Sequence, residues 1–193
     1  EKLEHALDSF QISVENRSVL DAGVSTGGFT DCVLQRGARR VFAVDVGRNQ
    51  LHEHMKSDAR VDWRDGVNVR DLVADDCPYP CSLLVADLSF ISLTKVLSAF
   101  FESVSGESGY QTPGMVLLVK PQFEAGRIEV SRGKGVITDP AIHQEACDTV
   151  RDAVVDLGGT VVGIIESPIK GAEGNTEFLM YVECPTRYVS CES

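Results

Sequence analysis

The chain has 193 residues, of which 43% are hydrophobic and 24% are charged, and its formal net charge is −11. A chain of this length predicts one domain with its own hydrophobic core. The acidic balance argues against nucleic-acid binding through the whole surface, but it allows a local basic patch. No run of about 18 apolar residues and no signal peptide is visible, so we expect no transmembrane helix.

The six cysteines are scattered along the chain, and only Cys77 and Cys81 are close in sequence. A lone C-x-x-x-C is a poor zinc signal, so no metal site is predicted. We expect reduced cysteines in a cytoplasmic protein, with Cys32 and Cys147 as thiols buried in helices. The chain opens at Glu1 inside a predicted helix, and we expect it to be a piece of a longer protein.

Apolar runs alternate with helical patterns along the chain. The predicted strands are Ser18–Ala22, Val41–Asp45, Val61–Trp63, Ser82–Asp87, Met115–Lys120, Thr160–Glu166 and Phe178–Glu183. The predicted helices are Lys2–Phe10, Gly27–Arg36, Gln50–Lys56, Leu93–Val104 and Ala141–Leu157. The strands are rich in Val, Leu and Ile, which indicates burial on both faces and hence a mostly parallel seven-stranded sheet between helix layers.

Several local signals refine this α/β prediction. Asp139 and Pro140 are a typical start for the last helix, and Gly158–Gly159 is a typical stop. The loop Ser167–Thr176 lacks a helical pattern, so the last strand is predicted to run antiparallel to its neighbour. Pro121–Thr138 has little core pattern and predicts a mobile loop at the ligand-binding edge; a merely solvated connector is the alternative.

A glycine-rich turn, Asp21-Ala-Gly-Val-Ser-Thr-Gly-Gly-Phe29, joins the first predicted strand to a helix. This order presents backbone N–H groups and a helix N-terminus to a nucleotide-like ligand. The spacing G-x-x-x-G-G differs from the dinucleotide pattern G-x-G-x-x-G. A carboxylate at Asp21 would repel a pyrophosphate and suits a cationic amino-acid tail, so we predict S-adenosylmethionine. Another nucleotide and a purely structural turn are the alternatives.

Polar side chains follow the next two strands. Asp45 can hold both hydroxyls of a ribose, and Asp65 to Asn68 can reach an adenine edge. One adenosine could contact all these segments, because the carboxyl ends of parallel strands share one edge. The predicted cofactor-binding residues are Asp21, Gly23, Ser25, Thr26, Gly27, Gly28, Phe29, Asp45, Val46, Asp65, Asn68 and Asp87.

Four charged residues are predicted to converge at the same edge. Asp87 and Lys120 end the fourth and fifth strands, and Glu177 begins the last one. Lys2 lies on a helix that can fold across the edge. A lysine that ends an apolar strand is unusual, since most lysines prefer solvent. The alternatives are an edge lysine that reaches solvent and an Asp87 that caps the following helix.

These four residues resemble the K-D-K-E tetrad of the FtsJ-like ribose 2′-O-methyltransferases, and the sequence is most similar to the TlyA family, often labelled hemolysin. The resemblance covers essentially the whole chain through Glu1–Leu7, Asp21–Cys32, Val44–Gly47, Asn68–Leu72, Asp87–Ile91, Val119–Glu124 and Gly174–Glu177. Val24 departs from the smaller residue common in that family, but its side chain can point into the core.

The resemblance implies a Rossmann-like class I methyltransferase fold and catalytic roles for Lys2, Asp87, Lys120 and Glu177. It implies methylation of ribosomal RNA at a cytidine 2′-hydroxyl in both ribosomal subunits. Lys120 would steer or accept the hydroxyl proton. The family normally has a small RNA-binding domain before this one, so we expect residues 1–193 to be a single methyltransferase domain without it.

RNA contacts are predicted at two basic clusters, with ordinary solvated charge as the alternative. The first comprises Arg127, Arg132, Lys134 and Lys170, with Phe123 as a stacking ring, and the second comprises Arg36, Arg39 and Arg40. Three rival functions remain: a methyltransferase with another substrate, a membrane-active hemolysin, and a domain that is idle without its partner domain. The sequence offers no Lys/Arg-rich amphipathic helix for the second.

Overall fold

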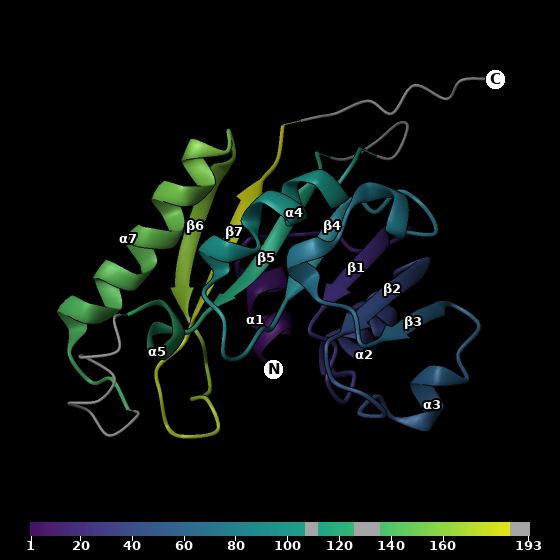
Figure 1. Ribbon diagram of the computed structural model, residues 1–193, viewed down its shortest axis with the longest axis horizontal. Helices are drawn as coiled ribbons and strands as arrows, with labels where there is room; N and C mark the ends of the chain where they lie inside the picture. The colour runs from purple at the N-terminus through teal and green to yellow at the C-terminus, as the bar shows by residue number, and fades with distance from the viewer. Residues whose placement is uncertain (107–111, 126–135, 186–193) are drawn as a thin grey trace.

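The computed structural model describes residues 1–106, 112–125 and 136–185 of the chain. Within these residues seven strands form one twisted sheet with the order β3-β2-β1-β4-β5-β7-β6 (Figure 1). The strands are β1 (Ser18–Ala22), β2 (Arg40–Asp45), β3 (Val61–Asp65), β4 (Leu83–Ala86), β5 (Gly114–Val119), β6 (Thr160–Glu166) and β7 (Phe178–Glu183). β1 pairs in parallel with β2 and β4, and β7 is antiparallel to both β5 and β6. The predicted fold class is therefore confirmed.

Helices cover both faces of this sheet. The α-helices are α1 (Lys2–Ser9), α2 (Gly28–Gln35), α3 (Glu53–Lys56), α4 (Leu97–Ser103), α5 (Pro121–Glu124) and α7 (Pro140–Asp156). Short 3₁₀ helices occupy Val69–Asp71 (η1), Ala74–Asp76 (η2) and Leu93–Lys95 (η3). The start of α7 is as predicted, because the Asp139 carboxylate accepts a hydrogen bond from Ala141 N at 2.9 Å and Pro140 follows it.

The strand residues alternate between two hydrophobic cores. Leu20, Phe42 and Leu84 pack with α4 and α7 on one face, whereas Val19 and Val41 pack with α1 and α2 on the other. This alternation follows from the two-residue period of a strand. Since both cores are apolar, the central strands are buried on both sides, as expected for parallel strands between helix layers.

Some predicted boundaries are wrong. The predicted helix over 93–104 is a 3₁₀ turn, η3, followed by α4, and the helix predicted from Gln50 begins only at Glu53. The predicted loop from Pro121 begins with α5, since proline favours the first turn of a helix. Its cations Arg127, Arg132 and Lys134 lie outside the described residues.

The strand register places the predicted site residues in a row at one edge. Ala22 pairs with Val44 and with Ala86, so the next residues Gly23, Asp45 and Asp87 lie side by side just past the strand ends. On the other half, Val119 pairs with Phe178 in antiparallel register. The residues beyond that pair, Lys120 and Glu177, therefore lie next to one another on neighbouring strands. The register alone thus brings both halves of the predicted site to one edge.

Leu7 tests how strongly α1 is anchored to the sheet. Its side chain is buried in the core between α1 and the strands. Leu7→Ala should lower the free energy of unfolding by about 2–5 kcal/mol, because the substitution removes apolar contacts and leaves a cavity. Chemical denaturation of both proteins measures this. His5→Ala on the exposed face of α1 is the matched control, and equal losses for both variants would contradict the packing.

Candidate active site

The glycine turn after β1 is held between two neighbouring strands. The N–H groups of Gly23 and Val24 both donate to the carbonyl oxygen of Val44, at 2.9 and 3.1 Å. Gly23 has φ of +85°, and a Cβ at this position would lie 2.5 Å from the carbonyl oxygen of Asp87. A larger residue is thus excluded by both conformation and space. The turn therefore passes close to the backbone after β4, as a ligand-binding turn requires.

A cavity of about 570 Å³ opens beside this turn. Six of the predicted cofactor residues line it: Gly23, Ser25, Asp45, Val46, Asn68 and Asp87. The other predicted residues, Asp21, Thr26, Gly27, Gly28, Phe29 and Asp65, do not belong to its lining, so their role stays a prediction. The volume is in the range typical of small-molecule sites.

The Asp45 carboxylate is fixed at the wall of this cavity. Its Oδ2 accepts from Ser25 N at 2.8 Å, and its Oδ1 accepts from Gly47 N at 2.7 Å. Each carboxylate oxygen has a second lone pair for a further donor. Both oxygens can therefore accept from a vicinal diol such as a ribose while the backbone holds them in place.

Asp21 is buried behind the cavity. Its Oδ2 accepts from the Thr30 hydroxyl at 2.6 Å, which ties β1 to the first turn of α2. Among the described residues, no group donates a hydrogen bond to its Oδ1. Burial raises the pKa of Asp21 to about 7, against the Thr30 hydrogen bond and with help from the charges of Asp87 and Asp45. Its role in holding a cationic tail stays a prediction, since the structure shows a contact with α2 only.

The four predicted catalytic residues form two ion pairs. Lys2 Nζ lies 2.6 Å from Glu177 Oε2, and Lys120 Nζ lies 2.6 Å from Asp87 Oδ1. Lys120 Nζ also donates to Ser89 Oγ at 3.1 Å. The Glu177 side chain is only 3% exposed, and a buried carboxylate of this kind needs a cation beside it. The structure thus brings each predicted lysine to a predicted acid.

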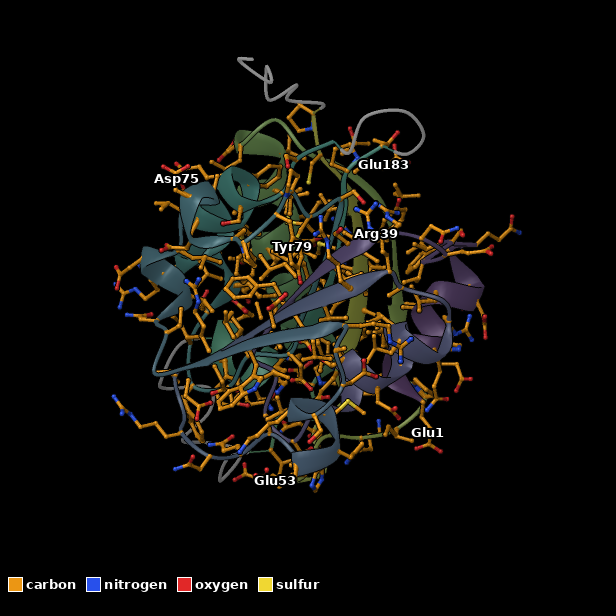
Figure 2. All side chains as sticks on the ribbon, turned by 90° about the vertical axis from the view of Figure 1, so that its right-hand side faces the viewer. Glu1, Arg39, Glu53, Asp75, Tyr79 and Glu183 are labelled. Atoms are coloured by element: carbon orange, nitrogen blue, oxygen red, sulfur yellow. The ribbon has the colours of Figure 1, made fainter. Side chains whose placement is uncertain are left out.

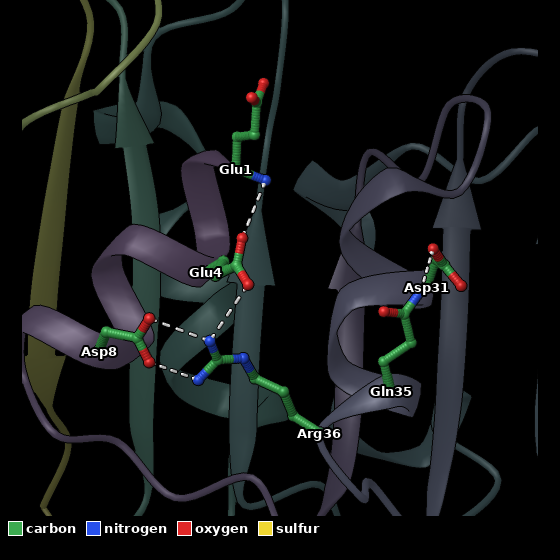
Figure 3. A network of polar contacts seen from close by, with 6 residues as sticks. All are labelled: Glu1, Glu4, Asp8, Asp31, Gln35 and Arg36. Atoms are coloured by element: carbon green, nitrogen blue, oxygen red, sulfur yellow. Dashed lines mark hydrogen bonds and ion pairs between the residues drawn. The ribbon is translucent and has the colours of Figure 1, made fainter.

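Helix α1 delivers Lys2 to this edge and is fixed at its other side by Arg36 (Figure 3). The Arg36 guanidinium makes two hydrogen bonds to the Asp8 carboxylate, at 2.6 and 3.1 Å, and lies 3.5 Å from Glu4 Oε1. Arg36 is the C-cap of α2, the helix that follows the glycine turn. The helix that follows the glycine turn is therefore joined to the helix that carries Lys2.

The loop between β6 and β7 positions Glu177. A Cβ on Gly171 would overlap the Glu177 carboxylate, so only glycine allows this close approach. Gly171 N donates to the carbonyl oxygen of Asn175 at 2.9 Å, and Asn175 Oδ1 accepts from Ile137 N at 2.9 Å. Asn175 is buried. The loop is therefore held internally and also held to the segment before α7.

An exposed aromatic residue borders the cavity and was not singled out from the sequence. Phe90 is 92% exposed, lines the cavity and has φ of +66°. Its ring centroid lies 5.3 Å from that of Phe123, and Lys120 Nζ lies 5.9 Å from the Phe123 centroid. A left-handed conformation is costly for a bulky residue. An exposed ring on a strained backbone beside a charged site is a candidate for contact with a ligand.

Glu124 fixes the segment after Lys120. Its Oε2 accepts from the Ser92 hydroxyl at 2.5 Å, and its Oε1 accepts from Leu93 N at 2.9 Å. Burial raises the pKa of Glu124, and these two hydrogen bonds oppose the rise. α5 is therefore tied to η3, and the backbone around Lys120 is held on both sides.

The second predicted basic cluster is not placed for RNA bound at this edge. Arg36 is engaged by Asp8 and Glu4, as above. Arg39 and Arg40 lie at the amino end of β2, and both donate to Ser18 Oγ, at 2.8 and 3.0 Å. Figure 2 shows Arg39 above the middle of the molecule, well away from Glu1 and Glu53 near its lower end. The three arginines are close in sequence, but they do not form one surface at the site.

The sheet order, the glycine turn and the row of acids at the carboxyl edge define a Rossmann-like methyltransferase fold. An S-adenosylmethionine dependent methyltransferase from Mesorhizobium loti superposes with a TM-score of 0.65, covering 95% of this chain and 98% of that one, at 13% identity. This likeness concerns the fold alone.

The family model for FtsJ-like methyltransferases matches residues 1–184, and the chain belongs to that family. The 16S/23S rRNA (cytidine-2′-O)-methyltransferase TlyA of Mycobacterium tuberculosis is 41% identical over 185 residues, which cover 96% of this chain and 67% of that protein. A Lactococcus lactis protein provisionally named a hemolysin has a solved structure with a TM-score of 0.89 at 41% identity, covering 96% of this chain and 86% of that one. The resemblance seen in the motifs is therefore confirmed.

None of the helices in the described parts of the chain has the length and apolar content to cross a bilayer.

The raised pKa of Asp21 predicts a pH dependence of stability. Between about pH 4 and pH 7 the folded state keeps a proton on Asp21 that the unfolded chain has released, so the free energy of unfolding falls as pH rises through this window. Asn cannot ionise and can still accept from Thr30. The free energy of unfolding of Asp21→Asn, minus that of the unaltered protein, should therefore increase as pH rises, by up to about 4 kcal/mol.

Urea unfolding of both proteins at several pH values between 4 and 8 measures this difference. Asp75→Asn removes an acid from the exposed surface and is the matched control. Parallel stability curves for Asp21→Asn and the unaltered protein would show that Asp21 is not buried as a neutral acid.

Proposed function

We propose that the chain is an S-adenosylmethionine-dependent 2′-O-methyltransferase that acts on a cytidine of ribosomal RNA. Two ion pairs carry the proposal: Lys120 with Asp87, which lines the cavity, and Glu177, beside the end of β5, with Lys2 on α1. A methyltransferase for a more reactive nucleophile would not need two lysines held by two acids. The substrate is carried over from the relative named as an rRNA (cytidine-2′-O)-methyltransferase.

The residues present fit S-adenosylmethionine. The cavity is about 570 Å³, the Asp45 oxygens suit the ribose hydroxyls, and Asn68 lies further along the wall, where a base edge would lie. Gly23 lets the turn pass close to the backbone of Asp87, which brings the turn and Asp87 to the same cavity. The acids Asp45 and Asp87 at the wall also favour a ligand with an ammonium and a sulfonium over a pyrophosphate.

When bound, this cofactor supplies an electrophilic methyl group on a sulfonium. A ribose 2′-hydroxyl that takes this methyl group from the sulfur would have to give up its proton, so a base must lie beside the hydroxyl. Lys120 in its neutral form is the candidate for this role, because its Nζ contacts Asp87 and Ser89, which both line the cavity. Glu177 beside the end of β5 and Lys2 on α1 would orient the ribose. The four residues thus position the hydroxyl and carry its proton away.

Phe90 offers a surface for the base of the target nucleotide. Its exposed ring borders the cavity and contacts Phe123. Recognition of single-stranded RNA commonly uses stacking of bases on such rings. A base stacked on Phe90 would bring its ribose toward Lys120, so the ring contributes to placing the hydroxyl.

Transfer of label from methyl-labelled S-adenosylmethionine to ribosomal subunits tests the proposal. We expect label that is removed by RNase and resists protease. Label that follows protein or small molecules would support the rival methyltransferase. Leakage of liposomes by the purified protein would support the membrane-active rival, for which the described residues offer no spanning helix.

The domain organisation follows the same proposal. The matched relatives are longer than this chain, and a separate RNA-binding domain would supplement the single methyltransferase domain. Ribosomal RNA as substrate also places the protein in the cytoplasm. Comparing subunit methylation by this chain with and without an added RNA-binding domain would test whether the methyltransferase domain is idle alone.

Replacing Lys120 separates chemistry from cofactor binding. Lys120→Ala removes the group placed to take the hydroxyl proton, so kcat should fall by about 10²–10⁴-fold. The Kd for S-adenosylmethionine, measured by calorimetry, should stay within about threefold, since Lys120 does not line the cavity. Lys95→Ala, at an exposed lysine of η3, is the control. Undiminished methylation by Lys120→Ala would remove it from the mechanism.

Replacing Phe90 separates stability from substrate binding. Glycine adopts positive φ without strain, so Phe90→Gly should leave the free energy of unfolding unchanged or raise it by about 1 kcal/mol. Loss of base stacking, which is worth about 1–3 kcal/mol, should lower kcat/KM for RNA by about 5- to 150-fold. Denaturation and steady-state kinetics on the same samples measure both. Full activity with unchanged stability would mean that the ring contacts no substrate.

A further inference from the structure

A second cavity of about 560 Å³ lies on the other side of the ion pairs from the cofactor cavity. It is formed by the first half of α7, the end of β6, the loop after β6 and the start of β7. Figure 1 shows all these segments at the same end of the sheet as the carboxyl ends of β1 and β5. The two cavities and the ion pairs therefore share one edge of the molecule.

The chain itself connects this second cavity to the catalytic residues. Thr176 and Phe178 line the cavity, and Glu177 between them pairs with Lys2. Consecutive strand residues point to opposite faces and are about 3.3 Å apart along the chain. The second cavity therefore begins one residue away from Glu177 along the chain, on the opposite face at the start of β7.

The lining combines aromatic, amide and cationic groups. The Phe178 and His143 rings lie 5.5 Å apart in an edge-on arrangement, and the cavity also contains Gln144, Arg151 and Lys170. The lining also contains one acid, Glu166, so its permanent charges are two positive and one negative, in a chain whose net charge is −11. Aromatic rings suit a nucleobase, an amide suits a base edge, and the cations suit a phosphate.

Both cations are held within reach of the cavity by local partners. Lys170 Nζ donates to Thr176 Oγ1 at 2.7 Å and lies 3.3 Å from Glu166 Oε1, while Arg151 pairs with Asp148 one turn earlier on α7. Their side chains are 55% and 39% exposed. Surface pairs of this kind are weak, so either cation can turn to a phosphate at small cost.

We propose that this second cavity binds the nucleotide next to the methylated one in the RNA substrate. The base lies against Phe178 and His143, Gln144 contacts its edge, and Arg151 and Lys170 contact the flanking phosphates. The inference rests on the proposed function, and it adds a subsite that determines which RNA strand is accepted. RNA is favoured over a protein segment because stacking rings, an amide and two cations occur together in one cavity.

The test uses Arg151→Gln and Lys170→Gln, with Arg60→Gln as the control. Arg60 also pairs with a nearby aspartate, Asp58. It directly precedes β3, which is the outermost strand on the side of the sheet away from β6. Two readouts are taken: the KM for ribosomal subunits, and the Kd of the protein for ribosomal RNA at several salt concentrations. Each cavity variant should raise both constants about tenfold relative to the control.

The salt series identifies the contact as one with phosphate. Loss of one phosphate contact to a single strand lowers the slope of log Kd against log salt by about 0.7. The Kd for S-adenosylmethionine should not change, because neither residue lines the cofactor cavity. Thermal unfolding confirms that each variant remains folded.

The outcomes separate this inference from the proposed function. If the unaltered protein methylates ribosomal RNA and the cavity variants behave like Arg60→Gln, the subsite is refuted and the function stands. A rise in KM with an unchanged salt slope would indicate contact with ribosomal protein and would also overturn the assignment to RNA. If no RNA is methylated, the proposed function fails, and the binding series still decides whether the cavity holds RNA phosphates.

Discussion

The antiparallel pairing of β7 with β5 is the constraint on which the candidate site depends. In parallel strands only the carboxyl ends meet at the ligand edge, so a residue at the start of a strand would lie at the far edge. Because β7 runs the other way, its first residues lie beside the end of β5, and Glu177 is next to Lys120. The two ion pairs therefore meet at one edge only because the last strand reverses.

The reversal of β7 also divides the residues at this edge into two groups. The cavity proposed for the cofactor lies at the ends of β1, β2 and β4, where the glycine turn and Asp45 lie. The residues proposed to contact the acceptor, Lys120 and Glu177, lie at the end of β5 and the start of β7. Glu177 is the most buried of the four charged side chains, and its desolvation is offset by Lys2. α1 must therefore stay docked, which its apolar face and Arg36 both favour.

Most strands could be predicted because they are continuous Val, Leu and Ile runs bounded by polar residues. β1, β6 and β7 have the predicted bounds. Helix boundaries were less predictable, since η3 and α5 are fixed to one another by Glu124, a contact between segments far apart in sequence. The convergence of Lys2 with Glu177 was predicted from the direction of the last strand and from a first helix that can fold across the edge, and the family resemblance agreed with it.

Two features of the site could not be predicted from sequence. A bulky residue such as Phe90 gives no sequence signal for a left-handed backbone, and its exposed ring is seen only in the structure. Asp21 pairs with Ala43, two residues before Asp45, so it lies inside the sheet and is buried against Thr30, whereas Asp45 ends β2 and lines the cavity. This difference in depth follows from the strand register, which sequence pattern alone does not specify.

The central claim is that this edge presents a ribose hydroxyl to a methyl donor. The most direct measurement is the chemical identity of the product. Ribosomal subunits are incubated with the protein and labelled S-adenosylmethionine, their RNA is digested to nucleosides, and the nucleosides are separated by chromatography and identified by the mass of the base fragment, which differs when the methyl group is on the base. The account predicts label in 2′-O-methylcytidine, whereas label on a base, such as 5-methylcytidine, would contradict it.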